Sequence, residues 1–144
     1  MPNTAHGSCL CGAVRFSAQL PSKWVVHCHC TRCQRAHGAA FVTWVGFDEA
    51  QVQINDAQHA WRWFRTPQYA SQRGFCSHCG SPMFFQSERE AGELHIARAL
   101  FNTPIDRTPE AHIHHDSRVD WMQIDSHLPI ESDRIKASGC ILVF

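Results

Sequence analysis

The sequence predicts a mainly β fold, a sandwich of short antiparallel strands with little helix. Two observations support this prediction. Short apolar or alternating segments recur about every ten residues, and Gly, Pro, Asn or Asp residues separate them, as in proteins built from successive hairpins. Seven of the eight cysteines also lie in three short clusters, a pattern typical of small domains that bind metal ions.

Eight segments are predicted as strands. They are residues 13–16, 24–28, 40–45, 52–54, 61–64, 82–85, 94–97 and 121–124. One short helix is expected, in which Thr31 caps a turn that runs from Arg32 to Ala36 and ends at Gly38. A late strand over the apolar residues 140–144 is a further expectation.

The length of 144 residues fits one domain, with a zinc-binding core at about residues 5–125 and a C-terminal strap at 126–144. Lys plus Arg and Asp plus Glu are equal at 13 each, so no nucleic-acid partner is expected. The start of the chain lacks the basic and apolar regions of a secretory signal, and no stretch reaches the ~18 apolar residues of a membrane span. A cytoplasmic protein without a membrane partner is therefore expected.

The cysteine clusters have the spacing of metal ligands. They are Cys9-Leu10-Cys11, Cys28-His29-Cys30-Thr31-Arg32-Cys33 and Cys76-Ser77-His78-Cys79. In an extended segment, residues two apart point to the same side, so two such thiolates can bind one ion. In a reducing compartment, clustered cysteines are more often metal ligands than disulfides. Zinc, which thiolates bind at about 2.3 Å, is the expected metal, with two ions per chain.

Spacing alone groups Cys9 and Cys11 with Cys76 and Cys79 in one four-thiolate site. Four protein ligands leave no open position, which is typical of structural zinc. Gly80 directly follows the last of these cysteines and is expected to permit a tight turn there.

The remaining cluster supplies three ligands, Cys28, Cys30 and Cys33. Three protein ligands and an open position are typical of catalytic zinc, and a three-ligand site is expected to be only partly occupied, or oxidised, after aerobic purification. A fourth protein ligand would close the site. The candidates for that ligand are Cys140, His27, His29, His37 or a histidine distant in the sequence.

Cys140 lies outside the clusters and is interpreted as a small buried hydrophobic residue. An alternative function, that of a methionine sulfoxide reductase, would need Cys140 as the nucleophile. The clusters do not show the paired C-x-x-C zinc motif of that enzyme, so this alternative ranks last.

The clusters and their flanking residues resemble the glutathione-dependent formaldehyde-activating enzyme family, whose domain is shared with centromere protein V. The resemblance lies in residues 7–16, 28–38 and 73–81, with a weaker segment at 112–121. It implies a β-tent fold, a structural zinc on the four-cysteine site and a second zinc on the three-cysteine site. The sequence departs from the family at His37, where a small hydroxyl residue is usual, and at His114 and His115, where apolar residues are usual.

The resemblance also implies an activity. The founding reaction of the family joins glutathione and formaldehyde to give S-hydroxymethylglutathione, and its reverse is a carbon-sulfur lyase reaction. We therefore expect a zinc-dependent enzyme that acts on a glutathione or other small-thiol adduct. His29 and His37 are candidates for proton transfer, and one or more of Arg32, Arg35, Arg73 and Arg118 for binding substrate carboxylates. The alternative is a non-catalytic interaction module with two structural zinc sites.

Overall fold

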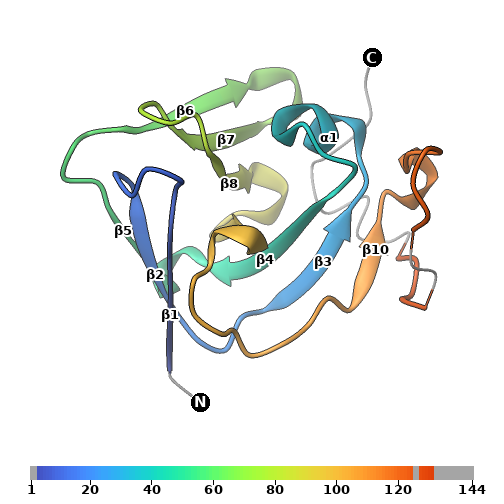
Figure 1. Ribbon diagram of the computed structural model, residues 1–144, viewed down its shortest axis with the longest axis horizontal. Helices are drawn as coiled ribbons and strands as arrows, with labels where there is room; N and C mark the ends of the chain where they lie inside the picture. Colours follow the sequence, from blue (N-terminus) through green and yellow to red (C-terminus); the bar gives the residue numbers. More distant parts are fainter. Residues whose placement is uncertain (1–2, 125–126, 132–144) are drawn as a thin grey trace.

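The computed structural model describes residues 3–124 and 127–131. These residues form two β-sheets and one α-helix (Figure 1), which confirms the mainly β prediction. The smaller sheet has the strand order β1 (Thr4–Ser8), β2 (Arg15–Gln19), β5 (Val52–Asn55) and is antiparallel throughout.

The larger sheet carries most of the domain. Its strand order is β10 (Ala111–Ile113), β3 (Trp24–Cys28), β4 (Val42–Asp48), β9 (Glu93–Ala97), β8 (Pro82–Ser87), β7 (Ser71–Cys76) and β6 (Trp61–Thr66). Neighbouring strands are antiparallel except β10, which pairs parallel with β3. The helix α1 (Thr31–His37) follows β3, and Figure 1 shows it near the ends of β3 and β7. Five short 3₁₀ helices occupy connections: η1 (Glu49–Gln51), η2 (Pro67–Tyr69), η3 (Glu88–Glu90), η4 (Arg98–Leu100) and η5 (His115–Ser117).

Alternation along the strands gives the larger sheet two buried faces. Phe84 and Ile96 belong to the main core, whereas Phe85 and Ala97, the next residues of β8 and β9, belong to a second cluster. The main core also contains Phe16 of β2, so it lies between the two sheets. The second cluster lies on the opposite face of the larger sheet and includes the cysteines of the α1 region.

The helix α1 forms where the sequence predicts it, but with a different N-cap. Cys30 is extended (φ −64°, ψ 145°), and its sulfur accepts a hydrogen bond from the backbone N–H of Cys33 at 3.2 Å. Cys30 rather than Thr31 is therefore the N-cap. Gly38 ends the helix in the left-handed conformation (φ 60°), as expected.

The strand predictions are confirmed for β3, β4, β5, β6, β8 and β9, with small shifts at their ends. The predicted segment 13–16 is displaced, because β2 begins only at Arg15. The prediction of a strand at 121–124 is wrong: these residues form bends and irregular backbone. Strands β1, β7 and β10 were not predicted. The predicted strand at 140–144 lies outside the described residues.

Candidate metal centres

Two hairpin turns supply the first group of cysteines. Cys9 and Cys11 lie in the connection from β1 to β2, whereas Cys76 ends β7 and Cys79 lies in the turn to β8. The sulfur of Cys11 is 3.7 Å from that of Cys9 and 3.8 Å from that of Cys76. Four sulfurs at 2.3 Å from a tetrahedral zinc would be separated by about 3.8 Å. The first group therefore fits zinc, and the chain places together the four cysteines that spacing had grouped.

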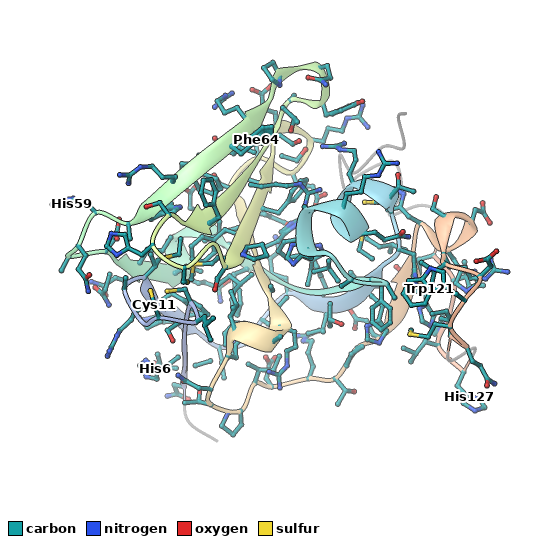
Figure 2. All side chains as sticks on the ribbon, turned by 45° about the horizontal axis from the view of Figure 1, so that its top comes forward. His6, Cys11, His59, Phe64, Trp121 and His127 are labelled. Carbon is teal, nitrogen blue, oxygen red and sulfur yellow. The ribbon has the colours of Figure 1, made fainter. Side chains whose placement is uncertain are left out.

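Backbone hydrogen bonds fix the turn that carries Cys76 and Cys79. The N–H of Gly80 donates to the carbonyl of Cys76 at 2.7 Å, and Gly80 is left-handed (φ 79°), as the sequence predicted. The hydroxyl of Ser81 lies 3.2 Å from the Cys79 sulfur and also accepts a hydrogen bond from the N–H of Leu10. Ser81 thereby joins the two turns. Figure 2 labels Cys11 on the side of the molecule opposite Trp121.

The second group lies where β3 passes into α1. Cys28 ends the strand, Cys30 caps the helix and Cys33 lies in its first turn. All three are buried, with no more than 1% of their surface exposed. Among residues 3–124 and 127–131, no fourth histidine, cysteine or carboxylate joins this group within metal-binding distance. Cys140, one of the candidates for a fourth ligand, lies outside the described residues.

The thiols of Cys28 and Cys33 have pKa values shifted in opposite directions. Cys28 donates a hydrogen bond to the Cys33 sulfur at 3.6 Å. This hydrogen bond, with a further contribution from the charge of Arg73, lowers the pKa of Cys33, whereas burial raises the pKa of Cys28. The pair therefore favours a thiolate at Cys33, the protonation state that a soft metal ion binds.

The sulfur of Cys30 is part of a disulfide in this structure. A disulfide sulfur is not a thiolate ligand, so metal binding by all three cysteines requires the reduced protein. The three sulfurs lie within 4.8 Å of one another, and the 3.6 Å between Cys28 and Cys33 is close to the separation in a zinc tetrahedron. The reduced second group therefore fits zinc with three protein ligands.

Among the four arginines considered from the sequence, Arg73 reaches the second group. Its Nη2 donates to the sulfur of Cys33 at 3.5 Å, and its guanidinium lies 5.0 Å from the ring centre of Phe85. Arg32 stacks instead on Tyr69, with 3.9 Å between the guanidinium carbon and the ring centre. The other two lie elsewhere: Arg35 is exposed on α1, and Arg118 donates to the backbone of η5.

The two candidate histidines occupy different surroundings. The His29 ring is fully buried beside Phe41, and its Nε2 lies 2.8 Å from Nδ1 of His112. The His37 ring packs against Trp44, with ring centres 5.2 Å apart. Burial, assisted by the charge of Arg73, lowers the pKa of His37 to about 4, so this ring is neutral at pH 7. A catalytic role for either histidine stays a prediction.

A cavity of about 410 Å³ lies beside the second group. His37 lines it from the end of α1, Val42 from the start of β4, and Arg98 from η4. The three cysteines do not line it, but Val42 is the strand partner of Cys28 and packs in the same buried cluster, so the cavity is one residue away from the cysteines. Its volume is within the usual range for small-ligand sites, roughly 300–1,000 Å³. Sequence reasoning did not find Arg98, because no motif marks a lone arginine as a cavity residue.

The sequence matches the family described as "Glutathione-dependent formaldehyde-activating enzyme" over residues 4–117. The chain belongs to this family. A curated protein of Halomonas elongata, provisionally named as a glutathione-dependent formaldehyde-activating enzyme, is 28% identical over 141 residues, which cover 90% of this chain and 84% of that protein.

Among solved structures, a crystal structure of a Rhodobacter sphaeroides protein has the same fold, with a TM-score of 0.58 and 19% identity. The match covers 69% of this chain and 89% of the Rhodobacter sphaeroides protein.

In the described part of the chain, no helix has the length and apolar character needed to cross a membrane.

Proposed function

We propose that this protein catalyses the reversible addition of glutathione, or a similar small thiol, to formaldehyde or another aldehyde. In the reverse direction, the reaction is that of a carbon-sulfur lyase. The observation that carries the proposal is the difference between the two cysteine groups. The first has four sulfurs, whereas the second has three, and a cavity of ligand size lies beside it. Membership of the family supports the choice of substrates.

We place the reaction at Cys28, Cys30 and Cys33, which would hold zinc. Zinc at a three-cysteine site supplies an open position and lowers the pKa of a thiol that enters it. Bringing thiol and aldehyde together at one position removes much of the entropic cost of their encounter. We assign the first group, Cys9 with Cys11, Cys76 and Cys79, to a structural zinc.

Residues around the cavity would bind and orient the substrate. Arg98 lines the cavity, and a guanidinium is suited to a carboxylate of a glutathione-like thiol. The neutral ring of His37 can exchange a hydrogen bond with a substrate in the same cavity. Phe41 and Val42 supply apolar lining that excludes water.

The test measures the rate at which ¹³C-formaldehyde and glutathione exchange with their adduct, by exchange NMR on reduced, zinc-loaded protein. The wild type is expected to accelerate exchange above the uncatalysed rate, and Cys33→Ser is expected to abolish the acceleration while the chain stays folded. A wild type without acceleration towards glutathione and other small thiols would refute the proposal. If Cys33→Ser also caused global unfolding, the interaction-module alternative would be favoured.

A further inference from the structure

Arg73 has a buried hydrogen-bond donor that no described residue of the protein accepts. The guanidinium extends from β7 to the second cysteine group, where Nη2 donates to the Cys33 sulfur. The other terminal nitrogen, Nη1, is buried and has no hydrogen-bond partner in the part of the chain that the structure describes. Buried N–H groups of arginine are rarely left unpaired, because each one that loses water without gaining an acceptor is unfavourable.

The neighbouring Arg32 differs from Arg73 in the side chains that its guanidinium contacts. It stacks on Tyr69 at 3.9 Å, and its Nη2 donates to the hydroxyl of Ser71 at 3.0 Å. Stabilising the Cys33 thiolate needs only Nη2 of Arg73. The orientation of the guanidinium against Phe85 therefore leaves Nη1 free for a ligand.

Arg73 does not line the cavity, but a chain of ring contacts links the two. Arg73 contacts Phe85, Phe85 packs against Trp44 with ring centres 6.0 Å apart, and Trp44 packs against His37, which lines the cavity. A ligand sulfur that joins the second group lies near Cys33, whose sulfur Arg73 contacts at 3.5 Å, so the atoms bonded to that ligand sulfur lie close to the guanidinium. A guanidinium N–H in a buried site binds anionic oxygen best, because the hydrogen bond is assisted by charge.

We propose that Arg73 is a substrate-binding residue that holds an anionic oxygen of the ligand, close to the ligand's sulfur, through Nη1. The identity of the reaction, but not the binding of the oxygen, rests on the proposed function. Two oxygens have this chemistry: the alkoxide formed on the aldehyde carbon and a carboxylate of the thiol.

The alkoxide forms when the substrate thiolate adds to the aldehyde carbon, a step that conserves electrons and protons. The electron pair of the substrate thiolate forms the carbon-sulfur bond, and the π pair of the carbonyl moves to its oxygen. That oxygen takes up the equivalent of the proton released by the thiol, so nothing is oxidised or reduced. Arg73 would stabilise the negative charge at the point where it develops, without itself losing a proton.

The binding test uses two small thiols of similar size, the anionic mercaptoacetate and the neutral mercaptoacetamide, at a pH where the difference in their thiol pKa is corrected for. Calorimetric titration of reduced, zinc-loaded wild type is expected to show mercaptoacetate binding at least about tenfold more tightly. Arg73→Gln is expected to remove this preference while it retains the zinc content of the wild type. Arg65→Gln, an exposed arginine on the adjacent strand β6, is the matched control and is expected to keep the preference.

A wild type without the preference, or an Arg73→Gln variant that keeps it, would overturn the inference. Loss of zinc from Arg73→Gln would also overturn it, because Arg73 would then act only through the cysteines. These readouts do not require catalysis. A preference for mercaptoacetate in a protein that does not accelerate adduct formation would refute the proposed function and leave the inference on Arg73 standing.

Steady-state kinetics identify the source of the oxygen. If Nη1 holds the alkoxide, Arg73→Gln lowers kcat by about 100- to 1,000-fold with little change in the KM for the thiol. If it holds a carboxylate, the KM for the thiol rises and kcat is retained. Unchanged kcat and KM in an active enzyme would contradict both assignments and the inference itself. Arg73→Lys, which keeps the charge but not the fork of donors, is expected to recover part of the loss.

Discussion

The two cysteine groups should contribute unequally to stability, because they close loops of very different length. In the first group, Cys11 and Cys76 are 65 residues apart in the sequence. In the second, Cys28 and Cys33 are 5 apart. A cross-link stabilises a fold mainly by restricting the unfolded chain, and the effect grows with the logarithm of loop length. The same relation gives about 4 kcal/mol for the long loop and about 2 kcal/mol for the short one.

Substitution of one buried cysteine in each group tests this reasoning. Cys76 and Cys33 are 0% and 1% exposed, so the packing lost on replacement by serine is similar and the difference reports the cross-links. Urea unfolding of reduced, zinc-loaded protein should give a free energy of unfolding about 4 kcal/mol lower for Cys76→Ser and about 2 kcal/mol lower for Cys33→Ser. Small domains have a total stability of about 5–15 kcal/mol, so Cys76→Ser should remove between about a quarter and four fifths of it.

Zinc content and urea slope are the controls in this comparison. The loop-closure difference applies to variants that have lost zinc from the substituted group and kept it at the other, and the slope of unfolding against urea should remain that of the wild type. Equal destabilisation by the two substitutions, or a larger effect of Cys33→Ser, would refute the loop-closure argument and the assignment of a structural role to the first group.

Three further predictions concern other parts of the molecule. Burial raises the pKa of Glu93, but hydrogen bonds from His95 and Lys23 outweigh it and lower this pKa from 4.5 to about 2. The stability that Glu93 provides should be complete above pH 4.5 and lost as the pH falls towards 2. Glu93→Gln should therefore remove on the order of 2 kcal/mol of acid-sensitive stability, measured by urea unfolding at a series of pH values. An unchanged pH profile of the free energy of unfolding would contradict this. A Cβ at Gly46 would overlap the Trp24 ring, so Gly46→Ala should destabilise the fold by about 1–3 kcal/mol and alter tryptophan fluorescence, whereas wild-type stability would show that the ring can move freely. A chelator should remove one of two zincs first from reduced protein, measured by elemental analysis, and two equally resistant ions would favour two closed sites.

The cysteine groups could be predicted because their signal is local. Spacing within each cluster fixes which sulfurs share a side, and Gly80 marks the turn that presents Cys79. The helix after Cys30 was predicted for the same reason, although a cysteine as N-cap was not, because Thr31 is the more usual capping residue.

The strands that sequence reasoning missed are those whose burial comes from distant partners. Strand β7 contains Gln72, Arg73 and Gly74, which have low strand preference. It is stabilised by pairing with β6 and β8 on its two sides. Strand β10 contains His112, a polar residue that is 1% exposed because it pairs with β3. The free donor of Arg73 was likewise invisible, because it depends on contacts between segments about forty residues apart.

The placement of the cysteines also sets an order of events during synthesis of the chain. All three residues of the second group are present once Cys33 has left the ribosome, and they need only the end of one strand and one helical turn to come together. The first group must wait until Cys79 has been made, with β3 to β7 already emerged. A nascent chain that has not reached the β8 hairpin can thus capture a metal at the second group, but cannot yet join its amino-terminal turn to the larger sheet.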